Sequence, residues 1–373
     1  MHIIHIIEAT ATGTLSMVEL LANQQVVEHE VTVIYSVRPD TPVGFSEIFD
    51  ERVNLQFINM SGLYAVSALV HLRKLLRSMP DAVVHCHSSV AGFLSRCALW
   101  RLPNRCFYSP HCIAFMRTDI SALQRSVFVF LERFAMLFAK QYIACSHSEA
   151  DMIRQYLPHA RVDVVENAVD FSIFPEPVSP EQGVSFHSNE KTSVTDNDNA
   201  LLPDIHVITV GGIRAQKDPH TFAQIATACP YEHVKFTWVG DGDETAKQVL
   251  LEAGVTITGW CTRAEVVNQL THADIYLSTA LWEGLPVALI EAQSVGAILI
   301  VNACSGNTDI VKNLETGYVF STVSQAHEIL YNVVTDLALA KFTAAKGPYI
   351  ARQRFGINRY CTAIQALYQQ NKR

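Results

Sequence analysis

The chain has 373 residues, of which 49% are hydrophobic and 17% charged, and its formal net charge is −8. This composition is typical of a soluble globular protein of two domains, and the negative charge argues against a nucleic-acid partner. No apolar run reaches membrane-spanning length. The nine cysteines include no Cys-x-x-Cys pair, which indicates reduced thiols in a cytoplasmic protein.

The first half of the chain predicts strands that alternate with helices. It starts with Met1–Ile7, which lacks a basic flank and resembles a buried strand rather than a signal peptide. Apolar runs of strand length are His2–Ile7, Val31–Tyr35, Val53–Ile58, Ala82–His85, Cys106–Tyr108, Tyr142–Cys145 and Val162–Val165. Helical patterns are Leu15–Val27, Ala65–Ser78, Val90–Trp100, Ala122–Phe138 and Ser148–Tyr156. Such alternation predicts a mostly parallel sheet covered on both faces.

A polar segment, Pro175–Asn199, then predicts a linker. After it the alternation restarts, with strands at Ile205–Val210, Val234–Val239, Val255–Thr258, Ile275–Ser278, Ile298–Val301 and Tyr318–Phe320. The helices between them are Thr221–Cys229, Thr245–Ala253, Arg263–Thr271, Pro286–Val295 and Asn307–Asn313. We expect an α/β protein with two Rossmann-like, doubly wound parallel-sheet domains, residues 1–172 and 203–345, facing a cleft. Residues 173–202 form the expected linker, and the helical segment 346–373 is expected to pack back on the first domain.

Two carboxylates frame the stretch from Glu283 to Glu291, which predicts a loop followed by a helix. Pro286 suits the first helical turn, and Gly296 suits the helix end. The free N–H groups at such a helix start bind anions, while carboxylates accept hydrogen bonds from sugar hydroxyls. One interpretation is therefore a site for a phosphorylated sugar. The other is a surface helix with two solvated acids.

Four other loops follow predicted strand ends and are candidates for ligand contact. Each holds small, polar or charged residues where a ligand approaches the backbone of an α/β sheet. They are Thr10–Thr14 with Gly13, Gly211–Asp218 with Arg214 and Lys217, Val239–Glu244 with Gly240, and Ser305–Ile310 with Gly306 and Asn307. Cations neutralise a diphosphate and glycine-rich nests bind anions, so together these loops favour a diphosphate site. A plain turn or a solvated basic loop is the alternative for each.

Histidines mark the strand ends of the first domain. His85 and His87 end one predicted strand, and His111 follows the next after Pro110, so His87 and His111 open onto the same sheet edge. Their spacing does not match a zinc cluster, and no metal is predicted. In a rigid turn, His111 suits contact with a reacting group, and a hydrogen-bonding scaffold role is the competing interpretation.

A basic patch lies between residues 96 and 140. Its basic residues are Arg96, Arg101, Arg105, Arg117, Arg125, Arg133 and Lys140. The apolar and aromatic segment Val127–Phe138 within it suits an anionic membrane surface. A helix packed against the sheet is the favoured interpretation, because so many large apolar residues leave little polar face.

The assembled pattern resembles the retaining GT-B glycosyltransferases of family four over nearly the whole chain. Its most specific element is the motif from Glu283 to Glu291, Glu-Gly-Leu-Pro-x-x-x-x-Glu-Ala. Supporting motifs are Val33–Ser36, Val84–His87, Ser109–His111, Val165–Asp170, Val210–Lys217, Val239–Gly242 and Gly306–Asp309. The stretch Tyr108–Asp119 is similar to members that build bacterial capsule, exopolysaccharide or lipopolysaccharide.

The resemblance implies a UDP- or GDP-linked sugar donor in the second domain and a glycan or polyprenyl-linked glycan acceptor in the first. Glu291 would hold the ribose and Glu283 the transferred sugar, while Arg214 and Lys217 neutralise the diphosphate and His111 faces the sugar across the cleft. Further donor contacts are expected at Gly13, Gly240, Gly259, Trp260, Gly284, Leu285, Pro286, Val287, Gly306 and Asn307. The family needs no metal or other cofactor, because protein cations and helix dipoles stabilise the leaving diphosphate. The expected location is cytoplasmic, with the basic patch as a candidate contact to the inner membrane.

The sequence departs from the family pattern in three places. Gly212 stands where the family has Arg, and Arg214 lies two residues on; Gly13 stands alone among threonines; and Asn167 is followed by Ala168 instead of Gly. Two alternatives stay open. A nucleotide-sugar epimerase of the same fold would need a pair of acid/base carboxylates in the first domain, where no clear pair is present. A catalytically degenerate scaffold subunit would tolerate Gly212.

Overall fold

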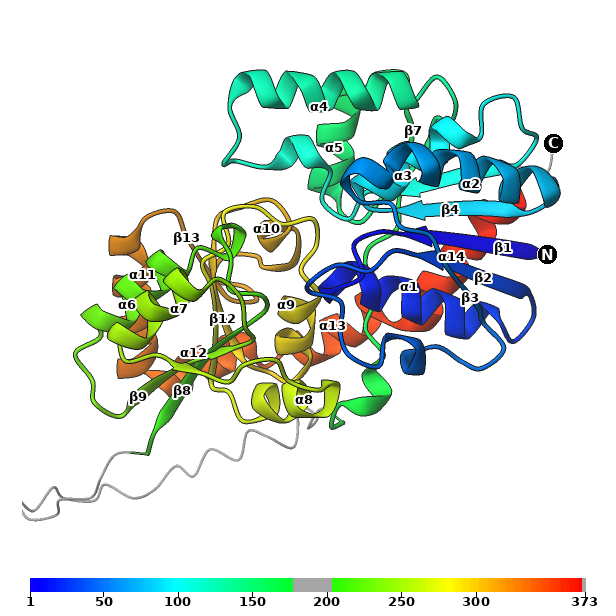
Figure 1. Ribbon diagram of the computed structural model, residues 1–373. Coiled ribbons are helices and arrows are strands. Elements are labelled where there is room, and N and C mark those ends of the chain that lie inside the picture. Colours follow the sequence, from blue (N-terminus) through cyan, green and yellow to red (C-terminus); the bar gives the residue numbers. More distant parts are fainter. Residues whose placement is uncertain (177–202, 371–373) are drawn as a thin grey trace, which may run out of the picture.

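The computed structural model describes residues 1–176 and 203–370, which form two α/β domains (Figure 1). The predicted linker falls almost entirely on residues 177–202, outside the described ranges. Each domain holds one parallel sheet with helices on both faces, so the predicted fold class, two doubly wound domains, is confirmed.

The first domain contains a seven-stranded sheet in the order β3-β2-β1-β4-β5-β6-β7. Its strands are β1 (His2–Ile7), β2 (Glu30–Tyr35), β3 (Asn54–Phe57), β4 (Val83–His87), β5 (Arg105–Ser109), β6 (Gln141–Ala144) and β7 (Arg161–Val164). Its helices are α1 (Thr12–Gln25), α2 (Ala65–Ser78), α3 (Ser89–Ala98), α4 (Ala122–Ala135) and α5 (His147–Tyr156). The chain leaves β1 in one direction for β2 and β3 and returns on its other side as β4. This change of direction opens a crevice at the carboxyl ends of β1 and β4.

The second domain contains a six-stranded sheet in the order β10-β9-β8-β11-β12-β13. Its strands are β8 (Ile205–Val210), β9 (Val234–Val239), β10 (Thr256–Ile257), β11 (Ile275–Ser278), β12 (Ile298–Asn302) and β13 (Tyr318–Phe320). Its helices are α6 (Pro219–Ala228), α7 (Glu244–Glu252), α8 (Arg263–Thr271), α9 (Val287–Ser294), α10 (Asn307–Ile310), α11 (Val323–Thr335) and α12 (Leu337–Ala344). The corresponding change of direction lies between β8 and β11.

Two further helices carry the chain back to the first domain (Figure 1). Helix α13 (Gly347–Phe355) packs against α9, and α14 (Ile357–Gln370) follows it. Tyr360, Ile364 and Tyr368 of α14 are buried in one apolar cluster with residues of β1, α1 and β5. The spacing of these three residues explains the contact, since positions four apart share one face of a helix. The chain end therefore bridges both domains.

Candidate functional site

The loops that follow β8 and β11 meet around the carboxylate of Glu283. Glu283 is buried, and its Oε1 lies 2.7 Å from the ammonium nitrogen of Lys217. Its Oε2 accepts a hydrogen bond of 3.2 Å from the side-chain amide of Gln216. Burial has the largest effect on the pKa of Lys217 and acts to lower it, but the charge of Glu283, its hydrogen bond and Tyr276 together raise that pKa. The two groups therefore form a charged, partly buried pair.

This ion pair resolves a conflict in the predicted anion site. A free carboxylate at the mouth of α9 would repel a phosphate held by the helix N–H groups. With Lys217 beside it, the carboxylate of Glu283 is neutralised and still has oxygen lone pairs for hydroxyl donors. Gly211, at φ +141, brings the backbone so close that a Cβ there would lie 3.1 Å from Cε of Lys217. The glycine turn thus makes room for the lysine.

The second predicted carboxylate, Glu291, lies inside α9 and is buried. Burial raises its pKa, and the guanidinium of Arg263 opposes that shift from 2.5 Å away. Sequence reasoning missed Arg263, which is the first residue of α8, after the cap Thr262. It also missed Gln216. No motif links Arg263 to Glu291, and the only signal was that Arg263 follows the expected base-binding residue Trp260 by three positions.

The loop Glu283–Pro286 also joins the two domains. A Cβ on Gly284 would lie 2.8 Å from the backbone nitrogen of Cys112 in the first domain, so only glycine fits there. The side-chain amide of Asn167 donates to the carbonyl oxygen of Leu285 at 2.7 Å. Helix α9 begins at Val287, one residue later than predicted, so Pro286 is its N-cap and not its first helical residue. The mouth of α9 thus opens at the domain junction.

The Gly13 loop faces the same helix start. Gly13 lies in the first turn of α1, and a Cβ built on it would lie 3.6 Å from Cγ2 of Val287. That distance is an ordinary van der Waals contact, so the first turn of α1 lies next to the N-terminus of α9. The loop is therefore a close approach between domains.

The loop at Gly306 packs closely against Glu283. Gly306 has φ +83, and a Cβ there would lie 2.8 Å from Cβ of Glu283. The Asn307 amide is buried and donates to Ser278 Oγ at 3.2 Å and to the Asn302 carbonyl at 3.1 Å. Its side-chain N–H groups are thus engaged inside the domain. The predicted anion nest therefore includes an asparagine that positions the loop.

Gly212 has no side chain, and the side chain of Arg214 lies beside it. Its side chain is exposed, and its Nε lies 3.8 Å from a Cβ built on Gly212. Its charge also reaches Lys217, whose pKa it acts to lower. Arg214 thus places a second cation next to the Glu283–Lys217 pair.

The residues expected to contact the base lie at the ends of β9 and β10. Gly240 and Gly259 form an isolated bridge, and the Gly240 N–H donates to Thr258 Oγ1 at 3.2 Å. Gly240 has φ +145, and a Cβ there would lie 2.2 Å from the Gly211 carbonyl oxygen. Trp260 is 61% exposed beside them. An exposed indole beside tightly packed backbone suits stacking of a flat ring.

Across the junction, the turn that carries His111 is held rigidly by a buried carboxylate. Glu149 Oε1 accepts hydrogen bonds of 2.8 Å from the backbone N–H groups of Cys112 and Ile113, and its Oε2 accepts one from Cys145. His111 and Cys112 both have left-handed backbone, at φ 53 and 87. Such conformations persist only where the surroundings fix them. Both carboxylate oxygens of Glu149 are therefore used to hold the backbone of this turn in place.

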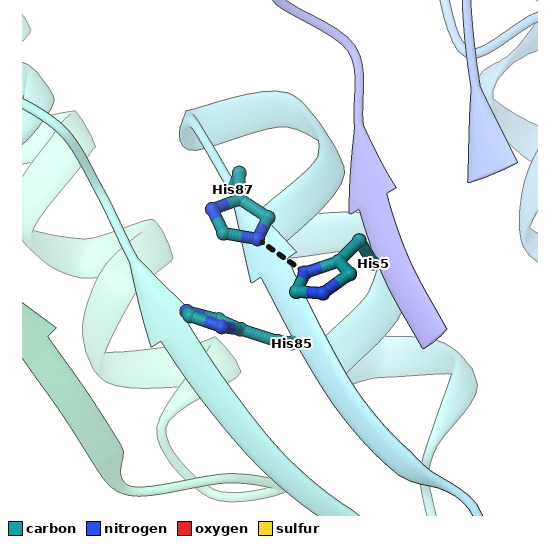
Figure 2. A group of neighbouring side chains, drawn as sticks. All are labelled: His5, His85 and His87. Carbon is teal, nitrogen blue, oxygen red and sulfur yellow. Dashed lines mark hydrogen bonds between the residues drawn. The ribbon is translucent and has the colours of Figure 1, made fainter. Parts of the chain in front are cut away.

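Three histidines, His5, His85 and His87, meet at the crevice between β1 and β4 (Figure 2), and His111 lies next to His87. Register places His5 beside His85 and Ile7 beside His87. Nδ1 of His5 lies 3.0 Å from Nε2 of His87, and Nδ1 of His87 lies 3.0 Å from Nε2 of His111. The sequence identified His87 and His111 as neighbours, but His5, inside an apolar strand, was missed.

The basic patch is smaller than predicted, because Arg96 is fully buried in an ion pair with Glu132 at 2.8 Å. Helix α4 buries Val129 and Ala135 against the domain. Its outer face exposes a row of large apolar side chains, Leu123, Val127, Phe130, Leu131 and Phe134, and Phe130 lines a pocket together with Arg125 and Arg133. The favoured interpretation, a helix packed on the sheet, therefore accounts for only one of its faces. Within residues 1–176 and 203–370, no helix is long and apolar enough to cross a membrane.

Two family models match the chain, one for each domain. The model described as Glycosyltransferase Family 4 matches residues 12–172, and the model described as Glycosyl transferases group 1 matches residues 195–333. Together they span both sides of the junction around Glu283.

Named relatives point in the same direction. The Escherichia coli protein UDP-Gal:alpha-D-GlcNAc-diphosphoundecaprenol alpha-1,3-galactosyltransferase is 28% identical over 74% of this chain and 72% of its own length. A Campylobacter jejuni N,N'-diacetylbacillosaminyl-diphospho-undecaprenol alpha-1,3-N-acetylgalactosaminyltransferase is 26% identical over 52% of this chain and 50% of its own. Among solved structures, Anabaena Alr3699/HepE in complex with UDP and glucose superposes with a TM-score of 0.78 at 15% identity, covering 99% of this chain and 100% of that one. This last likeness concerns the fold.

Proposed function

Because the chain belongs to the family-four glycosyltransferases of GT-B fold, we propose that it moves a sugar from a nucleoside diphosphate to a glycan or polyprenyl-linked glycan in bacterial surface-polysaccharide synthesis, with retention at the anomeric carbon. The observation that carries this proposal is the pair of buried carboxylates on one loop and helix, each held by a cation: Glu283 by Lys217 and Glu291 by Arg263. Buried carboxylates that keep acceptor capacity suit a ligand rich in hydroxyl groups.

In this account the diphosphate lies at the mouth of α9. The first N–H groups of the helix point there without intrahelical partners, and Arg214 supplies an exposed positive charge nearby. The negative charge that develops on the leaving diphosphate is then stabilised by groups already in place, so no metal ion is required. Glu283 holds the transferred sugar and Glu291 holds the ribose. Gly240, Gly259 and Trp260 surround the base.

The acceptor is proposed to enter from the first domain. The named Escherichia coli and Campylobacter relatives act on sugars linked to a diphospho-undecaprenol, a lipid. We propose a lipid-linked acceptor for this chain as well, reached at the cytoplasmic face of the inner membrane. The outer face of α4 supports this, because its exposed apolar side chains, with Arg125 and Arg133 next to Phe130, match an anionic lipid surface.

Nucleotide binding tests the role of Glu291. The Glu291→Gln variant should bind UDP or GDP, whichever the wild type prefers, roughly tenfold to a hundredfold more weakly, as expected when a charged acceptor of hydrogen bonds is lost. Calorimetry with each nucleotide measures the change. A nucleotide that lacks both ribose hydroxyls should bind the wild type more weakly than the normal nucleotide does, by a similar factor. The variant should bind the two nucleotides with nearly equal affinity. Equal binding of the ribose and dideoxyribose forms by the wild type would contradict the assignment.

The membrane contact is tested on α4. A double variant, Val127→Glu with Phe130→Glu, should bind vesicles of anionic phospholipid at least about tenfold more weakly, because burial of large apolar side chains drives such binding. Co-sedimentation with the vesicles gives the bound fraction. The matched control, Tyr331→Glu with Leu339→Glu, changes two exposed apolar residues of the second domain and should bind as the wild type does. If both double variants bind equally, α4 is not the contact surface.

A further inference from the structure

A row of hydrogen bonds runs from Gln25, at the end of α1, to His111, in the turn at the domain junction, and Figure 2 shows the bond between His5 and His87 in its middle. Oε1 of Gln25 lies 2.8 Å from Nε2 of His5. Nδ1 of His5 lies 3.0 Å from Nε2 of His87, whose Nδ1 lies 3.0 Å from Nε2 of His111. The remaining ring nitrogen, Nδ1 of His111, is buried and has no hydrogen-bond partner among the described residues. The row of hydrogen bonds thus has a closed end, at the oxygen of Gln25, and an open end, at the unpaired Nδ1 of His111.

Gln25, His5, His87 and His111 form a relay of hydrogen bonds, and its three imidazole rings are neutral near pH 7. Burial lowers the pKa of His5 to about 4 and that of His111 to about 4. Burial, followed by the neighbouring histidines, lowers the pKa of His87 well below its usual range. A charged imidazolium ring loses its hydration when it is buried, which costs free energy. Three adjacent rings would each pay this cost and would also repel one another. Each ring therefore carries one N–H proton.

The orientation of the Gln25 amide decides how these protons are arranged. The oxygen of the Gln25 amide lies 2.8 Å from Nε2 of His5, and the amide nitrogen is buried without a hydrogen-bond partner among the described residues. An amide oxygen only accepts hydrogen bonds. Nε2 of His5 is therefore the donor in this contact.

Counting the protons then fixes every tautomer. The contact between Gln25 Oε1 and His5 uses the proton of His5, which leaves its Nδ1 bare. That nitrogen accepts from His87 Nε2, so Nδ1 of His87 is bare and accepts from His111 Nε2. Three protons fill three contacts, and none is left for Nδ1 of His111.

We propose that the relay Gln25–His5–His87 fixes His111 in the tautomer whose Nδ1 is a bare acceptor at the domain junction. Gln25, His5 and His87 are positioning residues in this scheme, because they act through His111. The turn that bears His111 adjoins Gly284, since the backbone nitrogen of the next residue, Cys112, packs on that glycine. Resting on the proposed function, this arrangement means that His111 accepts a hydrogen bond from a substrate hydroxyl and does not donate one.

The same geometry argues against a metal site at these histidines. Nitrogens of His5, His85 and His87 lie within 4.8 Å of one another, which suits a metal ion by distance alone. Every ring nitrogen of these three residues, however, already has a hydrogen-bond partner: His85 contacts Tyr368 and Ser109 at 2.6 and 2.8 Å. A metal ion would take one nitrogen from each ring and leave buried partners unpaired, at a cost in free energy.

Nitrogen-15 NMR of the histidine rings in the full-length protein tests the relay directly. The wild type, without substrate and at neutral pH, should show bare Nδ1 and protonated Nε2 for His5, His87 and His111. In Gln25→Leu the acceptor at the closed end is lost, and His111 should become a mixture of tautomers. Gln25→Glu restores an acceptor and should restore the single tautomer. The matched control is Gln24→Leu, at an exposed position on the same helix, which should change nothing.

A protonated Nδ1 on His111 in the wild type would overturn the relay, and so would an unchanged single tautomer in Gln25→Leu. Ring nitrogens shifted by added zinc and restored by a chelator would likewise overturn it in favour of a metal site. Activity gives a separate readout: Gln25→Leu should lower kcat roughly tenfold with little change in donor KM, as expected for one misdirected hydrogen bond, and Gln25→Glu should recover it. If the NMR result is as expected but the wild type transfers no sugar, the proposed function fails and the relay stands.

Discussion

The Glu283→Gln variant is expected to lose sugar transfer by at least about a hundredfold in kcat, the scale seen when one preorganised electrostatic contact of an active site is removed. The substitution keeps the shape of the side chain but removes its charge. The ammonium of Lys217, 2.7 Å away, then lacks its counter-charge, and the transferred sugar loses a charged acceptor. The measurement is the rate of product formation at saturating donor.

A matched control separates this effect from a general loss of charge. Glu328→Gln makes the same chemical change at an exposed position of α11 and should transfer at the wild-type rate. Nucleotide affinity should change little in Glu283→Gln, because the ribose is assigned to Glu291. Full activity of Glu283→Gln would remove Glu283 from the site. A parallel loss of nucleotide affinity would assign it to the nucleotide instead of the sugar.

Replacing Arg96 by methionine is expected to destabilise the folded protein by about 3–5 kcal/mol, the usual cost of breaking a buried ion pair from one side. Arg96 is fully buried, its guanidinium lies 2.8 Å from Glu132, and it also donates to Tyr142 OH at 2.6 Å. The variant leaves the Glu132 carboxylate in an apolar interior without a counter-charge. Urea unfolding monitored by circular dichroism gives the change in free energy of unfolding.

The double variant Arg96→Met with Glu132→Leu provides the comparison. It removes both charges, so no ion is left unpaired, and it should recover most of the stability lost in Arg96→Met alone. If the double variant is as unstable as the single one, the loss comes from packing against Tyr108 and Tyr142, over which the guanidinium lies. If Arg96→Met unfolds like the wild type, the ion pair does not stabilise the fold.

The fold was predictable because its signal is spread along the chain. Buried parallel strands read as short apolar runs, and three of the longer ones, His2–Ile7, Ile205–Val210 and Val234–Val239, appear with the predicted bounds. The predicted strand Val53–Ile58 is shorter and spans Asn54–Phe57. The strand at Thr256–Ile257 is shorter than predicted, since register along an edge strand depends on its neighbour and not on its own residues. The predicted linker, residues 173–202, lies almost entirely outside the described ranges.

The site was only half predictable. Glu283, Glu291 and Lys217 lie in local motifs, and the structure brings Lys217 and Glu283 together. Arg263 and Gln216 belong to no motif, because their contacts depend on how neighbouring loops fold over the ends of the sheet. Arg263 reaches Glu291 across 28 positions of sequence, and nothing in the intervening segment marks the pair.

Two further features show why residue type alone misleads. Arg96 was assigned to a surface patch, as most arginines would be, but an acid 36 positions away allows it to be buried. His5 was read as part of an apolar strand, and the parallel register of β1 with β4 places it beside His85 and next to His87. Both depend on pairings between distant segments, which a single sequence does not display.

In the proposed function, Glu283, paired with Lys217, holds the sugar of a nucleotide donor for transfer. The most direct measurement incubates the purified chain with UDP- and GDP-linked sugars and a polyprenyl diphosphate-linked sugar acceptor, and follows products by mass spectrometry. We expect an acceptor heavier by one sugar with one donor class, and no such product with Glu283→Gln. An unchanged acceptor with every donor, together with no nucleotide binding by the wild type, would rule out the proposed sugar transfer and favour a non-enzymatic subunit.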